Sequence, residues 1–271
     1  MISDKGRSED GDAKGFLTGA RRTGIAEMVV REGGARVGEL SEQFGVSEVT
    51  IRGDLEVLAR EGRLIRDRGG ALAPTPPTIS LAFEQRSQHN LAAKRAIGKL
   101  AATLVEPGET ILLDAGTTVM EMAKFLIASP LSAPLTVVTN GLNIATYLGA
   151  LPDWRILLAG GWLDRNSLST LGPLAERDID DLVVDKVFLG AHALSAAFGV
   201  TDTSIEAARA KAAMVRAGRH VVLLADSSKW NQTGFARAVQ LSQIGQLITD
   251  DGLPAEAKTA IEACGVRVQI A

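Results

Sequence analysis

Apolar residues recur at helical spacing near the start of the chain. Ile25, Met28 and Val29 lie at positions i, i+3 and i+4, and this spacing places them on one face of a helix. A pair of glycines follows directly, and glycine commonly ends a helix. The pattern predicts a first helix over about residues 21–32.

Two further helices are predicted close behind the first. One covers residues 37–44 and closes at Gly45, and the next opens at Ser47, a residue type favoured at helix N-caps. The apolar faces are formed by Val37, Leu40 and Phe44 in the second helix and by Ile51, Leu55 and Leu58 in the third. Because only a short turn containing glycine separates them, the pair is typical of a helix-turn-helix.

The stretch after the third helix predicts a small β-hairpin. The sequence "GRLIRDRGGALA" (62–73) alternates short apolar pairs with arginines around a glycine pair. A hairpin in this place is the wing of a winged helix-turn-helix. The N-terminal domain is therefore expected to be of the α+β class.

The remainder of the chain has a different pattern. Helical patterns separate most of seven short apolar runs, which cover 110–114, 135–139, 155–159, 186–191, 220–226, 246–250 and 266–270. Continuous apolar strands that alternate with helices indicate a mostly parallel sheet covered on both faces. This part is predicted to be an α/β domain.

A proline-rich stretch separates the two patterns. "APTPPT" (73–78) holds three prolines in six residues, and prolines cannot join a regular ladder of hydrogen bonds. The polar start of the chain, with charges of both signs, reads as disordered. The predicted organisation is a disordered arm over 1–19, a winged helix-turn-helix over 20–73, a linker over 74–80 and an α/β domain over 81–271.

Composition narrows the setting of the protein. The 271 residues are 46% hydrophobic and 23% charged, which is ordinary for a globular protein. A single cysteine, Cys264, excludes an intramolecular disulfide, and we expect a cytoplasmic protein. We expect neither a signal peptide nor a membrane span, because no apolar run is long enough.

Charge alone does not indicate binding to nucleic acid. The net charge is −3, and residues 1–73 contain 12 Lys and Arg against 13 Asp and Glu. A DNA-binding function must therefore rest on where individual charges lie. In a helix-turn-helix, the N-terminal half of the second helix contacts base edges in the major groove.

The third predicted helix and the wing supply such local placement. Away from its apolar face the helix presents Ser47, Glu48, Thr50, Arg52 and Gly53, and the wing offers Arg63, Arg66 and Arg68 with the backbone amides of Gly69 and Gly70. Arginine pairs with guanine or with phosphate, and backbone amides follow phosphates. The alternative is a helical bundle with a solvated charged face.

Residues that follow the predicted strands suggest a ligand pocket, because ligands bind beyond the carboxyl ends of parallel strands. Asp114 precedes Gly116, Thr117 and Thr118, which open a helix. Free amides and hydroxyls at a helix start suit a phosphate. The other candidates after strands are Thr139, Asn140, Gly160, Gly161, His192, Asp202 and Lys229.

Each of these residues also has a purely structural interpretation. His192 is equally consistent with a structural and a pocket role, whereas His89 and His220 are read as structural, and Trp230 could merely cover the sheet. The joint occurrence of small, hydroxyl and amide residues at several strand ends favours a pocket for a small, anionic, hydroxyl-rich molecule.

An enzyme is a second interpretation of the same residues. Asp114, Asp202, Glu206, Lys211 and Lys229 could transfer protons near a sugar phosphate. Glu206 and Lys211 are five residues apart, about 500° of helix turn, so they do not share a helix face. No metal-ligand cluster, nucleophile elbow or dinucleotide fingerprint is present, and we expect no metal and no cofactor.

At these residues the sequence resembles the DeoR/GlpR family of bacterial regulators of sugar metabolism. The resemblance covers about 21–270 and rests on "VSEVTIRGDLEVLAREGRLIRDRGGA", "LLDAGTTVMEMA", "TVVTNGLNIA", "ILLAGG", "DKVFLGA", "GVTD" and "LLADSSKW". It implies a transcriptional regulator, usually a repressor of a carbohydrate operon, that binds double-stranded operator DNA as a dimer or tetramer. It also implies release by a phosphorylated sugar or polyol, and an effector domain similar in fold to ribose-5-phosphate isomerase and CoA transferases.

The resemblance also implies residue roles. By position, the effector candidates are Asp114, Gly116, Thr117, Thr118, Asn140, Glu206, Lys211 and Lys229, and the DNA-contact candidates are Ser47, Thr50, Arg52 and the wing. The chain departs from the family pattern at Gly53, where a second arginine is usual, at Arg68, where many members have histidine, and at 192–194. Gly53 predicts weaker binding of operator DNA by each head than in typical relatives. A regulator without an effector response is a third interpretation, against which the intact pocket motifs argue.

Overall fold

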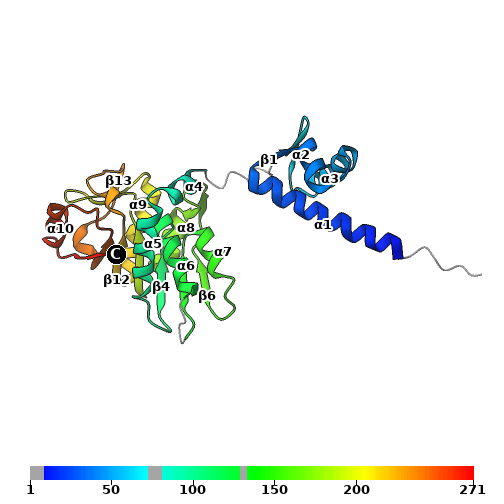
Figure 1. The fold of residues 1–271 in the computed structure, drawn as a ribbon. Coiled ribbons are helices and arrows are strands. Elements are labelled where there is room, and N and C mark those ends of the chain that lie inside the picture. Colours follow the sequence, from blue (N-terminus) through cyan, green and yellow to red (C-terminus); the bar gives the residue numbers. More distant parts are fainter. Residues whose placement is uncertain (1–8, 73–80, 129–132) are drawn as a thin grey trace, which may run out of the picture. The chain divides into compact units, whose positions relative to one another are not determined.

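The computed structural model describes residues 9–72, 81–128 and 133–271. The chain divides into two units, Met1–Thr78 and Ile79–Ala271, which are coloured along the sequence in Figure 1. The expected linker over 74–80 lies outside the described residues. Each unit is therefore described by itself.

Three helices form the body of the N-terminal unit: α1 (Glu9–Glu32), α2 (Val37–Phe44) and α3 (Glu48–Arg60). The apolar faces expected from the sequence meet in one core, where Ile25, Leu40, Ile51, Leu55 and Leu58 are completely buried. The predicted helix-turn-helix is present. Its turn is set by a left-handed glycine after α2 and by a serine hydroxyl that caps α3.

Helix α1 begins earlier than the sequence indicated. Residues 9–19 are helical, so the expectation of a disordered arm over 1–19 is wrong for them. No proline interrupts this segment, so nothing in it breaks the helix outright, although its three glycines (11, 15 and 19) are poor helix formers. Residues 1–8 lie outside the described part of the chain.

The predicted wing is a hairpin of β2 (Ile65–Asp67) and β3 (Gly70–Leu72). A third strand, β1 (Gly34–Arg36), pairs with the other side of β3. The strand β1 was not predicted, because three residues are too few for an alternating pattern.

The seven predicted strands of the C-terminal unit form one sheet. They are β4 (Thr110–Leu113), β5 (Thr136–Thr139), β6 (Arg155–Leu158), β9 (Val184–Gly190), β12 (Gly218–Leu224), β14 (Gln246–Thr249) and β15 (Arg267–Ile270). Their order is β15-β14-β12-β9-β4-β5-β6, and every neighbouring pair is parallel. The expectation of a mostly parallel sheet is confirmed.

Helices cover both faces of this sheet (Figure 1). Within β4, Ile111 and Leu113 join the core beneath α5 (Leu91–Ala102), α6 (Thr117–Ala128) and α7 (Leu142–Leu148), whereas Leu112 joins the core on the opposite face. That second core is covered by α8 (Pro173–Asp180), α9 (Ile205–Ala217) and α10 (Ala255–Glu262). Because side chains alternate along a strand, two covered faces require strands that are apolar at successive positions.

Several small elements were not expected. The hairpin of β7 (Trp162–Asp164) and β8 (Ser169–Leu171) is one, and the sheet of β10 (Ala193–Ser195), β11 (Gly199–Asp202) and β13 (Ala236–Val239) is another. The helix α4 (Leu81–Gln88) and the short 3-10 turns Ser227–Lys229 and Leu241–Gln243 complete the unit. None of the described helices is long and apolar enough to cross a membrane.

The strand order creates a switch point in the middle of the sheet. From β4 the chain proceeds outward through β5 to β6, and it then returns to β9, on the other side of β4, before it continues to β15. The connections that leave β4 and β9 therefore diverge to opposite sides. Such a point, at the carboxyl ends of the strands, is where open α/β sheets bind ligands.

Candidate functional site

A cavity of about 410 Å³ lies at the switch point of the C-terminal unit. This volume is within the range of small-molecule sites. Of the residues expected from the sequence, it is lined by Asp114, Gly116, Thr117, Thr118, Asn140, His192, Asp202, Lys211 and Lys229. The sheet thus brings together residues that lie more than a hundred positions apart in the chain.

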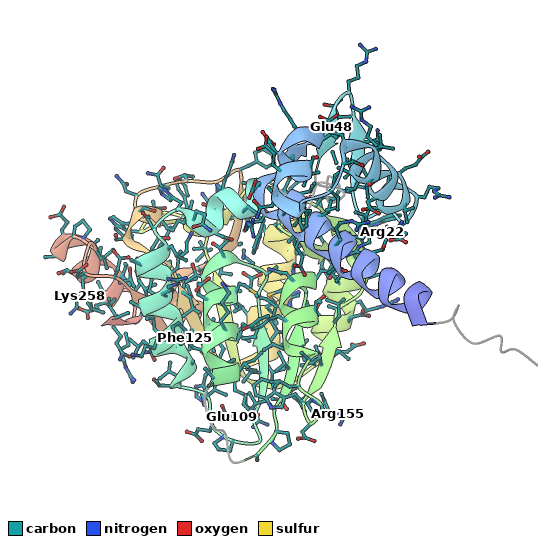
Figure 2. All side chains as sticks on the ribbon, turned by 45° about the vertical axis from the view of Figure 1, so that its right-hand side comes forward. Arg22, Glu48, Glu109, Phe125, Arg155 and Lys258 are labelled. Atoms are coloured by element: carbon teal, nitrogen blue, oxygen red, sulfur yellow. The ribbon has the colours of Figure 1, made fainter. Side chains whose placement is uncertain are left out.

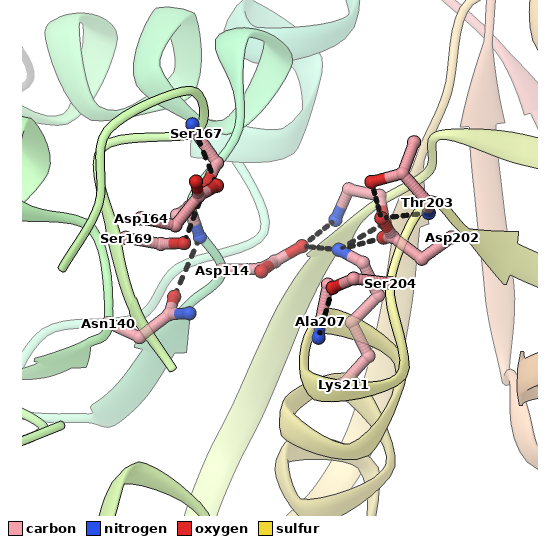
Figure 3. A network of polar contacts seen from close by, with 12 residues as sticks. Asp114, Asn140, Asp164, Ser167, Ser169, Asp202, Thr203, Ser204, Ala207 and Lys211 are labelled. Carbon is pink, nitrogen blue, oxygen red and sulfur yellow. Dashed lines mark hydrogen bonds and ion pairs between the residues drawn. The ribbon is translucent and has the colours of Figure 1, made fainter. Parts of the chain in front are cut away.

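The buried side chain of Lys211 forms the floor of the cavity (Figure 3). Its Nζ forms an ion pair with Asp114, lies 3.7 Å from a carboxylate oxygen of Asp202, and donates to the carbonyl of Gly190 at 3.1 Å. Burial alone would lower the pKa of Lys211, but the two carboxylates raise it above its ordinary value. Lys211 is therefore held as a cation.

The start of α6 supplies hydrogen-bond donors to the same cavity. Gly116, Thr117 and Thr118 line it, and the backbone amides at a helix start have no partner within the helix. Asn140 fixes the approach to this helix, since its Oδ1 accepts from the amide of Ala115 at 2.9 Å. The arrangement suits an anionic group.

The β7–β8 hairpin supplies hydrogen-bond acceptors on another wall. Asp164, Asn166, Ser167 and Ser169 line the cavity. The Asp164 carboxylate accepts from the amide of Ser167 at 3.1 Å and from its hydroxyl, and the hydroxyls of Ser167 and Ser169 lie 2.6 Å apart. These groups can bind the hydroxyls of a ligand.

The cationic wall was not found from the sequence. Arg86 from α4, and His89 and Lys94 beside and within α5, line the cavity. The Nζ of Lys94 donates to the carbonyls of Arg86 and His89, and the guanidinium of Arg86 donates to the carbonyl of Asn166 at 2.6 Å. Burial lowers the pKa of Lys94. These residues precede the first strand of the sheet, so they could not be predicted from the residues that follow strands. The interpretation of His89 as purely structural is incomplete, because His89 also lines the cavity.

Four of the expected residues do not line the cavity. Thr139 is completely buried, and its hydroxyl donates to the carbonyl of Leu113 and accepts from the amide of Gly141. Gly160 donates its amide to Asp178, and Gly161 packs against the backbone of β8. Glu206 is exposed on α9. Thr139, Gly160 and Gly161 have local structural contacts instead, and Glu206 faces away because five positions of helix separate it from Lys211.

In the N-terminal unit, the start of α3 presents exposed polar groups. The Ser47 hydroxyl accepts from the amide of Thr50 and lies 2.9 Å from the Thr50 hydroxyl. Arg52 forms an ion pair with Glu48, one turn earlier, at 2.8 Å; Glu48 is labelled in Figure 2. Both charged side chains are more than half exposed and can exchange this pair for contacts with DNA.

The wing places three arginines on the surface and one glycine inside. Arg63, Arg66 and Arg68 are exposed, as is Gly69 in the hairpin turn. Gly70 is buried in the central strand, and a Cβ there would lie 2.3 Å from the carbonyl of Ala35. Contact of the Gly69 and Gly70 amides with DNA stays a prediction, and the buried position of Gly70 between β1 and β2 does not favour it there.

Gly53 is exposed on α3, and a Cβ at this position would meet nothing within 4 Å. The guanidinium of Arg66 reaches across from the wing and donates to the carbonyl of Arg52 at 3.0 Å. Arg66 of the wing therefore lies close to Gly53, the position of α3 that has no side chain. No group of three or more His, Cys, Asp or Glu that could hold a metal occurs among the residues that the structure describes.

A helix-turn-helix with a wing, joined in one chain to an α/β unit with a polar cavity, defines a ligand-sensing DNA-binding regulator. Residues 21–76 match the model of the DeoR-like helix-turn-helix domain, and residues 89–251 match that of the DeoR C-terminal sensor domain. The chain belongs to the DeoR family of transcriptional regulators.

Relatives match over almost the whole chain. It is 35% identical over 253 residues to the HTH-type transcriptional regulator GlpR of Haloferax volcanii. This match covers 93% of this chain and 98% of that protein. It is 37% identical over 253 residues to the uncharacterized HTH-type transcriptional regulator YulB of Bacillus subtilis (93% and 96%). The glycerol-3-phosphate regulon repressor of Escherichia coli K12 is 30% identical over 230 residues (85% and 90%).

Among solved structures, ribose 5-phosphate isomerase A from Neisseria gonorrhoeae is similar to part of the chain. The match covers 51% of this chain and 52% of that one, with 17% sequence identity and a TM-score of 0.37. The fold assignment rests on the strand order described above.

Proposed function

We propose that this protein represses a carbohydrate-utilisation operon by binding double-stranded operator DNA, and that a phosphorylated sugar or polyol releases it. The observation that carries the effector assignment is the composition of the cavity. A cationic wall and the start of α6 meet hydrogen-bonding groups of the β7–β8 hairpin within about 410 Å³.

Each part of such an effector has a matching group. The phosphate binds at Gly116, Thr117 and Thr118, where helix amides and hydroxyls suit an anion, with Arg86 and Lys229 close to the same space. The hydroxyls of the sugar or polyol bind Asp164 and its neighbours in the hairpin. The name of the Escherichia coli relative, a glycerol-3-phosphate regulon repressor, supports a phosphorylated polyol or sugar as the class.

DNA recognition uses α3 and the wing. Arg52 reads a base edge or a phosphate from the major groove, and Ser47 and Thr50 contribute hydroxyls at the start of the helix. Arg63, Arg66 and Arg68 follow the phosphates. Because operators of helix-turn-helix proteins hold two half-sites, the protein acts as a dimer or tetramer in the cytoplasm.

The effector acts by shifting a population. A ligand that binds one arrangement of the two heads better than the other moves the equilibrium towards it, and a coupling of about 1–3 kcal/mol is typical of such switches. DNA binding and effector binding then oppose each other. The same linkage makes operator DNA weaken effector binding by the same factor.

The residues of the cavity favour a sensor over an enzyme. Lys211 is held as a cation by two carboxylates, so it cannot accept a proton, and Glu206 lies outside the cavity. A sugar-phosphate isomerase with an appended DNA-binding head is the competing function. It requires Asp114 or Asp202, which line the cavity but are paired with Lys211, to act as the base on the substrate.

A ligand panel tests the proposal. Glycerol-3-phosphate, ribose-5-phosphate, glucose-6-phosphate and their unphosphorylated forms are titrated into the full-length protein by calorimetry, and products are followed by NMR. Binding of a phosphorylated compound without turnover, together with release of duplex DNA selected from a random pool, supports the repressor. Turnover supports the isomerase.

A variant pair identifies the cavity as the binding site. Lys229→Gln removes a cation that lines the cavity and is expected to weaken the phosphorylated ligand at least about 10-fold. Lys99→Gln removes an exposed lysine of α5 and is expected to leave the affinity unchanged. Equal affinities of the two variants would place the ligand elsewhere.

A further inference from the structure

The strand β6 is an edge of the large sheet and has an unusual surface. Among the described strands it has a neighbour, β5, on one side only. Leu157 and Leu158 are exposed by 45% and 40%, and successive side chains point to opposite faces of a sheet. The sheet is therefore incompletely covered on both faces at this edge.

Edge strands that remain exposed to water usually carry charges, prolines or bulges that prevent pairing with another strand. β6 has none of these in its apolar part. Its one charged residue is Arg155, at its start (labelled in Figure 2). Its unpaired edge is thus suited to receive another strand.

The exposed apolar surface continues from β6 onto neighbouring elements. We define the β6 patch as Tyr147 of α7, Leu157 and Leu158 of β6, Trp162 and Leu163 of β7, and Leu174 of α8, which are exposed by 38% to 80%. Helix α7 packs against β6, and β7 follows β6 after three residues. The Trp162 ring lies beside Gly172, at the start of α8, so the patch extends around the edge of the sheet from the α7 face to the α8 face.

The extent of the patch matches one half of a dimer interface. At about 200 Å² for a large apolar residue, the exposed fractions correspond to roughly 600 Å². A standard interface buries about 800 Å² on each partner, with an apolar core and a polar rim. The patch therefore supplies the core of an interface of ordinary size.

We infer that the β6 patch joins two copies of this chain around a two-fold axis, with β6 of one copy antiparallel to β6 of the other. An isologous contact uses the same surface on both partners. Antiparallel pairing of a strand with itself satisfies the backbone groups of both edges in one step. Two copies also provide the two heads that paired DNA half-sites require.

The β7–β8 hairpin connects this interface with the cavity. It contributes Trp162 and Leu163 to the β6 patch and Asp164, Ser167 and Ser169 to the cavity wall. A ligand that contacts the hairpin therefore lies only one to seven positions along the chain from the interface residues, and we expect its binding to act on the interface. This link rests on the proposed function, whereas the interface itself does not.

The mass of the full-length protein in solution tests the interface. The variants Leu158→Glu and Trp162→Glu are compared with Ile270→Glu and Phe235→Glu, which change residues of matched exposure (42% and 80%) outside the β6 patch. Sedimentation velocity is recorded over a range of protein concentrations. Because each copy carries the substitution, two like charges would enter the apolar core of the interface. We expect them to weaken association by at least about 100-fold.

Loss of half the assembled mass in the two patch variants, with both control variants unchanged, supports the inference. A wild-type monomer of 28.5 kDa at all concentrations overturns it, as do patch variants that keep the wild-type mass. The second of these results would also follow if another part of the same chain covered the patch. None of these readouts uses DNA or an effector, so failure of the interface and failure of the proposed function are distinguishable.

A cross-link gives an independent result if a glutamate variant does not fold. Cys264 is the single cysteine and is exposed, so Cys264→Ser provides a cysteine-free background for Leu157→Cys. Across a two-fold axis at β6 the two new thiols lie within reach of a disulfide, which needs Cα atoms less than about 7 Å apart. Oxidation is expected to yield a covalent dimer, whereas Ile270→Cys in the same background is not. Equal cross-linking of both would overturn the assignment of the axis.

Discussion

Both units bury a charged side chain between two opposite charges, and the clusters around Asp54 and Lys211 have opposite signs. In the N-terminal unit the buried carboxylate of Asp54 accepts from Arg21 at 2.7 Å and from Arg22 at 2.8 Å. In the C-terminal unit the buried ammonium of Lys211 lies between Asp114 and Asp202.

The surroundings of the two clusters differ. Arg21 and Arg22 are 18% and 32% exposed, so both can turn to water if Asp54 is removed. Asp114 and Asp202 are nearly completely buried, so they have much less access to water than the two arginines. The first cluster therefore connects α1 to α3, whereas the second holds a buried cation at the cavity proposed as the effector site.

The largest expected effect comes from Lys211→Met, which leaves two buried carboxylates without their cation. Removal of one partner of a buried ion pair costs about 3–5 kcal/mol of unfolding free energy. The three tryptophans, Trp154, Trp162 and Trp230, all lie in the C-terminal unit, so urea unfolding followed by tryptophan fluorescence reports this unit. Lys99→Met, at an exposed position on α5, is the control. A loss no larger than the about 1–3 kcal/mol expected below for Asp54→Asn would remove the difference between the two clusters.

A smaller effect is expected from Asp54→Asn in the N-terminal unit. The amide keeps the shape but loses the charge, and the two arginines regain water, so we expect a loss of about 1–3 kcal/mol. This unit contains no tryptophan, and its unfolding is followed by far-UV circular dichroism. The tryptophan transition should not move. If the tryptophan transition moved as much as the dichroism signal, the effect of Asp54 would not be limited to the N-terminal unit. Asp67→Asn, in the exposed wing, is the control variant.

Gly53→Arg addresses the surface of the head rather than its core. The position is open, so the arginine fits, and one added phosphate contact should tighten operator binding and raise the salt slope by about 1 per head. Fluorescence anisotropy with operator DNA over a salt series measures both. Gly53→Ala separates charge from helix propensity, because alanine improves the helix by about 1 kcal/mol without a charge. An arginine variant with the slope of the alanine variant would show that position 53 does not face DNA.

The head was easier to predict from sequence than the cavity. The spacing of apolar residues such as Ile25, Leu40 and Leu55 predicts the three helices. The same spacing predicts which helix faces form the core. What was missed there is β1, whose pairing with β3 is a tertiary contact that three residues do not encode.

The seven strands of the large sheet were also predictable, since most contain a continuous apolar run and β15 alternates polar and apolar residues. The cavity was predictable only where a strand end supplies the residue, as with Asp114 and Asn140. Arg86 and Lys94 reach the cavity from helices before the sheet, and the folding of α4 and α5 over the switch point has no local pattern. Gly160 and Gly161 show the opposite error, because they follow a strand yet turn away into the hairpin.

The smallest expected effect concerns pH and the cavity wall. Burial lowers the pKa of His192 and outweighs the opposing charge of Asp202. The unfolded chain therefore binds this proton more readily than the folded one, and stability falls as pH drops below the ordinary value of 6.5. Asp226 acts in a separate window: burial would raise its pKa, but hydrogen bonds from Ser228 and Asn90 lower it, so its contribution is lost only below about pH 3.8.

His192→Gln should flatten the acid side of the stability curve. Between pH 7 and pH 5.5 the melting temperature of the C-terminal unit, followed by tryptophan fluorescence, should fall by about 2 °C less in this variant than in the wild type. His220→Gln, at an exposed position on β12, should keep the wild-type fall. Because the N-terminal unit contains no histidine, its melting should not respond to either change. A parallel fall in both units would show that general charging, rather than the cavity wall, sets the pH dependence.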